Sequence, residues 1–220
     1  MVDRNRSRAA KAAHKLRRLL TRERELWGGG LERVAGVDEV GVGPLAGPIV
    51  AGAVIFPPEI GIKGVDDSKK LSAKRRDALA EEIREQALCW AVVAVEPAEI
   101  DQLNIYQAGL TAMRRALKQL DPAPQHVLVD GRGSVPLLPF DQECVIGGDA
   151  ACHAIAAASI LAKCERDRRM CAYDETFPGY GFAAHKGYPT QDHRDAIRRL
   201  GPTEIHRRSF TLLPPPRLFD

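Results

Sequence analysis

The nine residues from Pro48 to Phe56, PIVAGAVIF, carry no charged or hydrogen-bonding side chain. A short apolar run of this kind predicts a buried strand, and its lack of polar alternation suits the centre of a sheet. The segment before it, RVAGVD (33–38), predicts a second strand. Only a short glycine-rich turn separates the two, and parallel neighbours would need a longer crossover. The sheet is therefore expected to contain an antiparallel pair.

Helical and extended segments alternate after this pair. The apolar runs CWAVVAVE (89–96) and HVLVDG (126–131) predict two further strands. The glycine- and proline-rich stretch 177–190 predicts a loop. Apolar side chains at helical spacing, with caps or stops at the ends, predict helices over residues 72–87, 97–120, 147–173 and 190–201. Strands that alternate with helices indicate an α/β domain with a mixed sheet.

Composition limits the class of protein. The chain has 220 residues, of which 45% are apolar, enough for one sizeable core. Its five cysteines include no C-x-x-C pair, which predicts reduced thiols rather than a disulfide framework or a zinc site. No apolar run approaches the roughly 20 residues that span a bilayer, and the N-terminus lacks the apolar core of a signal peptide. We therefore expect a cytoplasmic protein with no membrane segment.

Positive charge is concentrated at the N-terminus. Residues 1–33 contain ten Lys or Arg and four Asp or Glu, a local excess of six, although the whole chain has a net charge of only +3. Within this arm, residues 9–27 have helical character, and the glycines at 28–30 predict the helix end. Two interpretations stay open: a solvated helix packed loosely on the body, or an arm that binds a polyanion through its charge.

Four acidic residues stand where strands end or a helix begins. Asp38 and Glu39 end the first strand, Asp130 ends a later strand, and Asp149 opens a helix. The ends of strands are where α/β sheets build their sites. Consecutive strand residues point to opposite faces, so we expect Asp38 and Glu39 to share a site only if the chain leaves the pleat there. The glycines that follow make such a departure easy.

These acids predict a metal site. Carboxylates without His or Cys partners are hard oxygen ligands that suit Mg²⁺ or Mn²⁺, and gathered acids repel one another unless a cation lies between them. Two ions roughly 4 Å apart can activate a water and stabilise a departing oxyanion, as in many phosphodiester-cleaving enzymes. Spacing alone leaves simpler explanations for two of them, Asp149 as a helix cap and Asp130 as a turn former.

Six segments, in order, carry a resemblance to a known family: GVDEVGVGPLAGP, DDSKKLS, LVDG, GGDAACHAIAAASILAKCERDR, HKGYPT and GPTEIHRRSF. Together they closely resemble bacterial ribonuclease HII, the type 2 enzyme that cleaves RNA embedded in or paired with DNA. The match runs from about residue 34 to residue 210. It implies a ribonuclease H-like fold, a mixed five-stranded sheet flanked by helices, with a C-terminal helical extension. It also implies a metal-dependent endoribonuclease that leaves 5′-phosphate and 3′-hydroxyl ends, with catalytic and metal-binding residues Asp38, Glu39, Asp130 and Asp149.

The resemblance also implies residues that bind the substrate. Tyr188, in HKGYPT, matches the tyrosine that stacks beneath the sugar of the deoxynucleotide following the ribonucleotide. A ring at that position reads shape rather than base identity. Lys69, in DDSKKL, and Lys186, in HKGY, match basic residues near the substrate backbone.

One position departs from the family pattern. The family usually has D-E-x-G-R-G, whose backbone and arginine grip the ribonucleotide, whereas this chain has Val42 between Gly41 and Gly43. The three backbone amides can still donate hydrogen bonds, because they do not depend on the side chain. The missing guanidinium removes a charge-assisted contact, so we expect normal chemistry with weaker or less junction-selective binding.

The remaining polar candidates are predicted to be structural. His153, His185 and His193 are expected to be satisfied or exposed, and Asp167 is expected to pair with neighbouring arginines. A C-terminal set of basic residues could line the duplex groove through phosphate contacts: Arg194, Arg198, Arg199, Arg207 and Arg208.

These observations combine into one hypothesis with two rivals. We predict a basic helical arm (1–30), a ribonuclease H-like catalytic domain with its C-terminal helical part (31–210) and an extended tail (211–220). The expected enzyme is a monomer that uses Mg²⁺ or Mn²⁺, two ions during catalysis, on RNA–DNA hybrids and ribonucleotide-containing duplex DNA. The rivals are a catalytically impaired nucleic-acid-binding protein and a DNA nuclease of the same fold, such as a resolvase or integrase-like enzyme.

Overall fold

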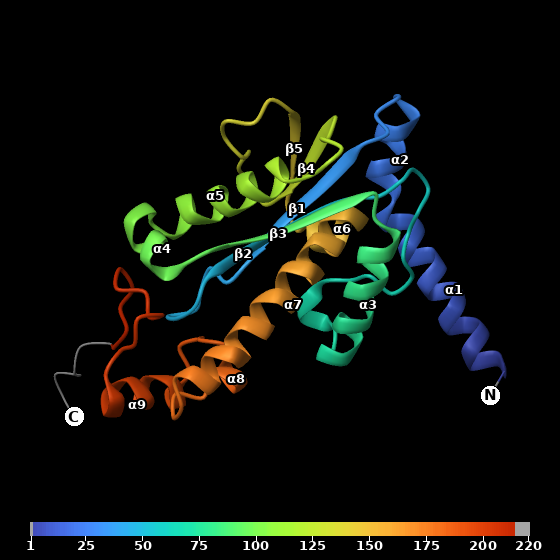
Figure 1. The fold of residues 1–220 in the computed structure, drawn as a ribbon. Coiled ribbons are helices and arrows are strands. Elements are labelled where there is room, and N and C mark those ends of the chain that lie inside the picture. Colours follow the sequence, from blue (N-terminus) through green and yellow to red (C-terminus); the bar gives the residue numbers. More distant parts are fainter. Residues whose placement is uncertain (1, 214–220) are drawn as a thin grey trace.

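Five strands form one mixed sheet in the computed structural model, which describes residues 2–213, with side chains from residue 10 onward (Figure 1). The strand order is β3-β2-β1-β4-β5. β1 pairs antiparallel with β2 and parallel with β4, β2 pairs antiparallel with β3, and β4 pairs parallel with β5. The bounds are β1 Val34–Val40, β2 Ile49–Ile55, β3 Cys89–Val95, β4 His126–Asp130 and β5 Asp141–Val145. The mixed five-stranded sheet is thus confirmed.

The strands differ in how clearly the sequence indicates them. All seven residues of β2 are buried and the strand lies inside the sheet, as its apolar run predicts. β5 has the sequence DQECV and lies at an edge, where none of its residues is fully buried. Its pattern gives no strand signal, because an edge strand needs few apolar side chains.

Helices cover both faces of the sheet. Helices α4 (Pro97–Leu103) and α5 (Ile105–Lys118) lie on one face, and α7 (His153–Thr176) lies on the other, with α3 (Ala73–Gln86) beside it (Figure 1). The backbone of α7 approaches the sheet closely at two strand glycines. A Cβ on Gly36 would lie 2.2 Å from the carbonyl carbon of Ala154, and one on Gly52 would lie 2.3 Å from the Ala158 oxygen. The alanine-rich half of α7 therefore needs both glycines opposite it.

Two predicted helices are each divided in the structure. The helix predicted over 97–120 breaks at Asn104, which has a φ of 67° and whose side chain accepts a hydrogen bond from the Gln107 amide at 3.0 Å. The helix predicted over 147–173 breaks at Cys152, which is extended and buried, so that α6 (Gly148–Ala151) is a separate turn before α7. Asn adopts positive φ and caps helices more readily than most residues. The alanine-rich pattern contains no such signal, and both single-helix predictions are wrong.

The later part of the N-terminal arm is docked on the body rather than loosely attached. It forms α1 (Val2–Leu19) and α2 (Thr21–Gly28), and Leu19 and Leu20 are 2% exposed. Glu23, also 2% exposed, accepts a hydrogen bond from the Ala154 amide at 2.9 Å and thereby caps the first turn of α7. Burial raises the pKa of Glu23 to about 7. The loosely packed interpretation is therefore wrong for this part of the arm.

A small C-terminal subdomain follows α7. It contains α8 (Phe182–His185) and α9 (Gln191–Leu200), packed around the fully buried Phe182. The loop predicted over 177–190 thus includes one helical turn. Most of the predicted extended tail lies outside the described residues. None of the described helices has the length and apolar character that crossing a bilayer requires.

Candidate active site

Asp38 and Glu39 occupy opposite faces of β1. The strand remains paired with β2 through Val40, so the chain does not leave the pleat, which was the condition expected for these two acids to share a site. Asp38 shares the face of Gly36, toward α7, and lies beside Ser159. Glu39 points to the α5 face, where a Cβ on Gly109 would lie 3.9 Å from its Cγ.

Side chains from the two faces of the sheet can approach one another where the pairing of β1 with β4 ends. Their parallel pairing ends at Val37 and Val129, one residue before Asp38 and Asp130. Because no further pairing closes this gap, side chains from either face of β1 can approach Asp130. The Asp130 charge indeed acts on the pKa values of both Asp38 and Glu39.

Asp149 reaches the same region from α6. The Oδ1 atom of Asp130 accepts a hydrogen bond from the Gly148 amide at 2.7 Å, which ties the start of α6 to the end of β4. Asp149 follows directly and lies in the first turn of α6. Its pKa is raised by burial and by the charges of Asp67 and Asp130. The structure thus brings the four predicted acids to one end of the β1–β4 pair.

Burial and repulsion from neighbouring carboxylates hold Asp38 and Glu39 toward their neutral forms. Asp38 is 5% exposed, and burial, followed by the charges of Glu39 and Asp130, raises its pKa well above the usual range. Burial and the Asp130 charge raise the pKa of Glu39 to about 7. Like charges in a poorly solvated site favour a bound cation, which would stabilise the ionised forms.

The donor set fits a hard divalent cation, although the side chains are not yet gathered around a common point. All four candidates supply carboxylate oxygens, the ligands that Mg²⁺ and Mn²⁺ prefer. Among the residues that the structure describes, no three His, Cys, Asp or Glu side chains are close enough together to hold a metal ion as they stand. Asp38 and Asp130 each accept a backbone N–H at 2.7 Å instead, from Glu39 and Gly148 respectively.

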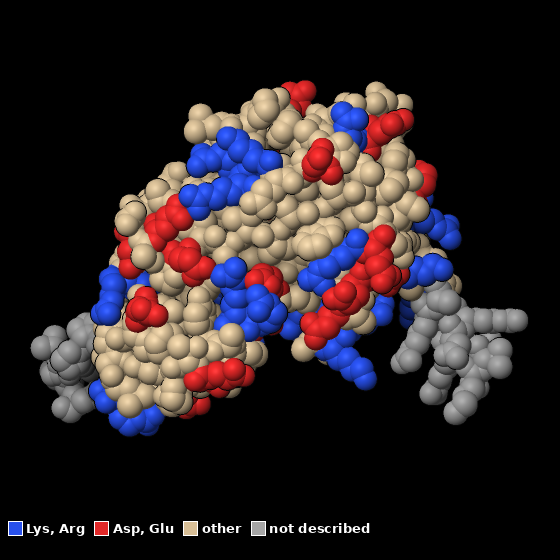
Figure 2. Space-filling model, in the orientation of Figure 1, with Lys and Arg blue, Asp and Glu red and all other residues tan. Residues whose placement is uncertain are grey.

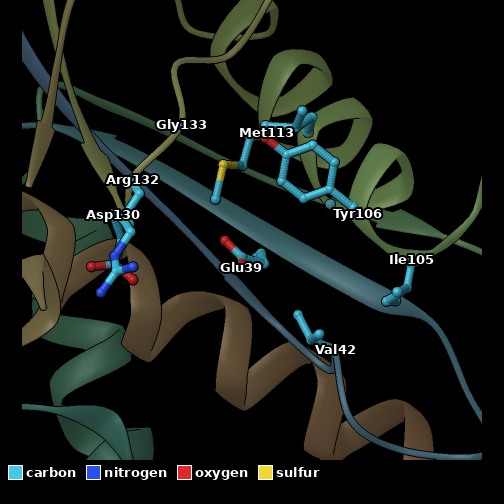
Figure 3. A pocket seen from close by; sticks show the side chains of 11 residues that line it. Glu39, Val42, Ile105, Tyr106, Met113, Asp130, Arg132 and Gly133 are labelled. Atoms are coloured by element: carbon cyan, nitrogen blue, oxygen red, sulfur yellow. The ribbon is translucent and has the colours of Figure 1, made fainter. Parts of the chain in front are cut away.

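A pocket of about 230 Å³ opens beside the acids on the α5 face (Figure 3). Figure 3 shows Glu39 between Asp130 and Val42, below the helix that carries Tyr106 and Met113. The remaining lining residues are Ile105, Gly109, Leu110, Gly131, Arg132 and Gly133. Two carboxylates therefore face an accessible, largely apolar recess.

The predicted glycine-rich loop, residues 41–48, follows β1 directly. Gly41 has a φ of 104°, a conformation that other residues rarely adopt, and a Cβ there would also lie 2.5 Å from Nε of Arg166. Val42 is 46% exposed, and the Gly43 backbone lies against Tyr188, whose Cε1 would be 3.8 Å from an added Cβ. Three of the predicted substrate-binding positions thus follow the acids closely in the chain, and one of them, Gly43, lies against Tyr188.

Two fully buried arginines hold this loop, a role that the sequence did not predict for either of them. Arg207 donates to the carbonyls of Gly41, Val42 and Gly47 at 2.6, 3.0 and 3.0 Å. Arg166 donates to the carbonyls of Pro48, Ala46 and Lys186 at 3.0, 3.2 and 3.0 Å. Both side chains are 0% exposed. Hydrogen bonds to several carbonyls offset part of the cost of burying each cation.

The signals for these two arginines differ. Arg166 continues a buried stripe of α7 at helical spacing, formed by Ser159, Ala162 and Met170. An arginine in such a stripe could have been recognised as buried. Arg207 has no such signal, because its carbonyl partners lie 160 to 166 residues away in the sequence. Its predicted place in a duplex groove is wrong.

The predicted basic and aromatic substrate residues share a second pocket. Lys69, Lys186 and Tyr188 line a recess of about 410 Å³. Tyr188 is 40% exposed, and the Arg166 guanidinium lies 6.0 Å from the centre of its ring. The Lys186 Nζ donates to the Ala183 carbonyl at 2.6 Å and to the Cys171 sulfur at 3.1 Å, so this amine is held against the protein.

Other candidates have structural partners. His153 is buried and accepts a hydrogen bond from the Ile62 amide at 3.0 Å. Asp167 pairs with Arg76 at 3.0 Å and Lys163 at 2.6 Å rather than with the arginines beside it in the sequence. Of the remaining C-terminal arginines, three bind protein groups, Arg194 the Leu212 carbonyl, Arg198 the Asp195 carboxylate and Arg199 the Gly179 carbonyl.

Comparison with known proteins identifies the class and then the family. The fold matches the ribonuclease H2 crystal structure from Pyrococcus horikoshii OT3 with a TM-score of 0.69 and 27% identity, over 82% of this chain and 94% of that one. The chain is therefore a ribonuclease H-like α/β protein. The model of the Ribonuclease HII family matches residues 35–213, and the chain belongs to that family.

A sequence relative agrees with the family, and a more distant structure agrees with the fold. The Ribonuclease HII of Anaeromyxobacter sp. (strain Fw109-5) is 56% identical over 196 residues, which cover 89% of this chain and 62% of the relative. The chain thus spans less than two thirds of the length of that relative. A crystal structure of Bst RNase HIII in complex with Mn²⁺ has a TM-score of 0.57 and 21% identity, over 86% of this chain and 65% of that one.

Proposed function

We propose that this chain is a metal-dependent endoribonuclease that hydrolyses the RNA strand of RNA–DNA hybrids and incises 5′ of single ribonucleotides in duplex DNA. The products would carry 5′-phosphate and 3′-hydroxyl ends. The observation that carries this proposal is the convergence of Asp38, Glu39 and Asp130 where β1 and β4 separate. Burying several like charges together is costly and is common at functional sites.

Asp38, Glu39, Asp130 and Asp149 would hold Mg²⁺ or Mn²⁺, in two positions during catalysis. Such ions supply activation of a water and stabilisation of the leaving oxyanion. The four carboxylates would orient them beside the recess of Figure 3, where Glu39 and Asp130 are accessible. The Mn²⁺-bound structural relative is consistent with this choice of metal.

The surrounding residues suit a nucleic-acid backbone. The amides of Gly41, Val42 and Gly43 would bind the ribonucleotide, and the Tyr188 ring would pack against the next sugar. Lys69 and Lys186 would lie near phosphates. On the face shown in Figure 2, Lys and Arg lie on both sides of a broad uncharged band, with Asp and Glu beside them on each side. All these groups come from one chain, so we also propose that a monomer suffices. We further propose that it acts in the cytoplasm.

The test is a panel of three duplexes: one ribonucleotide in DNA, an RNA–DNA hybrid, and all-DNA of the same sequence. With Mg²⁺ we expect cleavage of the first two and none of the third, and chelation with EDTA should abolish it. Equal cleavage of all-DNA would favour a DNA nuclease of the same fold. Binding without cleavage in either metal would favour the impaired nucleic-acid-binding protein.

Val42→Arg should strengthen substrate binding. The residue lines the recess beside Glu39 and is 46% exposed, so a guanidinium there can reach a phosphate without displacing the core. A charge-assisted hydrogen bond contributes about 1.5–3 kcal/mol, so Kd for the single-ribonucleotide duplex should fall about tenfold or more. Kd is measured by fluorescence anisotropy in Ca²⁺.

The matched control is Leu88→Arg. Leu88 is also 46% exposed and precedes β3 at the opposite end of the sheet. Leu88→Arg therefore adds the same charge as Val42→Arg, but far from the acids. Its Kd should change less than twofold. An equal fall in Kd for both variants would mean that the effect comes from net charge alone. An unchanged Kd for Val42→Arg would contradict the prediction.

A further inference from the structure

Three imidazoles lie behind the loop that carries Tyr188. His185, His193 and His206 surround the Phe182 ring, with centroid distances of 5.8, 5.4 and 5.7 Å. His193 and His206 are 0% and 1% exposed. The two rings join directly, since their Nε2 atoms are 3.1 Å apart. This cluster is outside the acid site and has no part in the chemistry proposed above.

Fixed partners determine where each proton lies in this cluster. The Thr203 amide can only donate, so Nδ1 of His206 accepts it at 2.9 Å, and a neutral His206 carries its proton on Nε2. That proton can only be given to Nε2 of His193. His193 therefore carries its own proton on Nδ1, which donates to the Tyr188 carbonyl at 2.9 Å.

The third ring is determined in the same way. The Gly187 amide donates to Nδ1 of His185 at 3.1 Å, so His185 carries its proton on Nε2 and donates to the Tyr180 carbonyl at 2.8 Å. A second proton on His193 or His206 would set two donors against each other. Burial accordingly lowers the pKa of both His193 and His206 to about 4. The hydrogen bonds that run from the Thr203 amide through His206 and His193 to the Tyr188 carbonyl form a relay. This relay is complete only while these two rings are neutral.

The relay connects the two loops proposed to contact substrate. His206 forms an isolated bridge with Ala46 of the glycine-rich loop, and the Leu45 amide donates to the Gly187 carbonyl at 2.8 Å. The Tyr188 side chain in turn lies against Gly43. The position of the ring relative to the glycine-rich loop therefore depends on the backbone hydrogen bond at Tyr188.

From these contacts we infer that His193, oriented by His206, is a positioning residue that sets the Tyr188 ring against the glycine-rich loop and thereby contributes to recognition of the RNA–DNA junction. This inference rests on the proposed function, because Tyr188 matters only if it meets substrate. The relay itself acts on the Tyr188 backbone and touches neither substrate nor metal.

Two substitutions of His193 separate its two hydrogen bonds. In Asn, the side-chain amide nitrogen stands as far from the backbone as Nδ1 of His, so His193→Asn can retain the bond to Tyr188. In Gln, the side-chain amide stands near the position of Nε2. His193→Gln can therefore keep the hydrogen bond with His206, but it loses the hydrogen bond to the Tyr188 carbonyl. The readout is the ratio of kcat/KM on a single-ribonucleotide duplex to kcat/KM on a uniform hybrid.

We expect His193→Gln to lower this ratio about tenfold, mainly through KM on the junction substrate, and His193→Asn to restore it to within about twofold of wild type. In a Tyr188→Ala background, His193→Gln should have no further effect on the ratio, because the ring it positions is gone. Equal ratios for Asn and Gln, or an undiminished effect in the Tyr188→Ala background, would overturn the inference.

A second measurement does not depend on activity or on any variant. Side-chain ¹⁵N NMR of the wild-type protein at pH 7 should show neutral rings, with the proton on Nδ1 of His193 and on Nε2 of His185 and His206. A charged His193 or the opposite tautomer at His206 would also overturn the inference. If no ribonucleotide duplex is cleaved but the tautomers agree, the proposed function fails while the relay stands.

Discussion

Asp38→Asn is expected to abolish cleavage of ribonucleotide duplexes while raising thermal stability. The substitution removes a charge that would help hold the cation, and we expect the rate to fall at least about 10³-fold, or roughly 4 kcal/mol in activation free energy. In the folded protein without metal, however, Asp38 is 5% exposed and close to the charges of Glu39 and Asp130. Removing this repulsion should stabilise the fold.

The substitution Asp38→Asn changes the charge with little change in packing, so a change in stability can be assigned to the charge. Asn is nearly isosteric with Asp, and its side-chain oxygen can still accept the Glu39 amide, now at 2.7 Å from Oδ1. A gain of about 1–2 kcal/mol would raise Tm by roughly 2–8 °C for a chain of this size. Tm is measured in EDTA, and activity in Mg²⁺ and in Mn²⁺.

Asp141→Asn is the matched control, because Asp141 begins the edge strand β5 and is exposed. It should leave both Tm and cleavage unchanged. An active Asp38→Asn enzyme would remove Asp38 from the catalytic set. A lower Tm would mean that Asp38 is stabilised by its surroundings rather than strained by them. Activity that costs stability in this way is common where a site gathers like charges.

The four acids could be predicted because each stands at a boundary that the sequence marks. Asp38 and Asp130 follow apolar strands and precede glycines, and Asp149 begins a helical pattern. The fold class followed from alternating strand and helix patterns in the same way. These signals are local, and the parallel register of β1 and β4 then brings Asp38 and Asp130 together. That these acids hold metal stays a prediction.

What the sequence could not provide is long-range pairing. It predicted that the chain must leave the pleat for Asp38 and Glu39 to share a site, whereas the strands separate instead. It gave no sign that Glu23 would cap α7 from 131 residues away, or that Cys152 would divide the predicted helix. The edge strand β5 was expected only from the family resemblance. Each of these features depends on which segments meet in the folded chain, and not on local periodicity.

Arg207→Met is expected to destabilise the fold more than any other substitution considered above. Arg207 is 0% exposed and donates to three carbonyls of the glycine-rich loop, from Gly41, Val42 and Gly47. Methionine has a similar length but no donor, so all three carbonyls would lose this partner. Each buried group left unpaired costs about 1–3 kcal/mol.

An opposing effect must be weighed against this loss. Burial lowers the pKa of Arg207 to about 9, so the buried cation is itself costly, and its removal recovers part of the difference. The two buried carbonyls left without this partner, of Gly41 and Gly47, outweigh that recovery, and we expect a net loss of about 3–5 kcal/mol, or a fall in Tm of about 6–20 °C. The neighbouring Arg208→Met is the control, because Arg208 is exposed and its substitution should shift Tm by less than about 2 °C. A similar Tm for Arg207→Met and wild type would show that the loop keeps its conformation without the guanidinium, and the buried cation would then have to be explained by substrate binding rather than by stability.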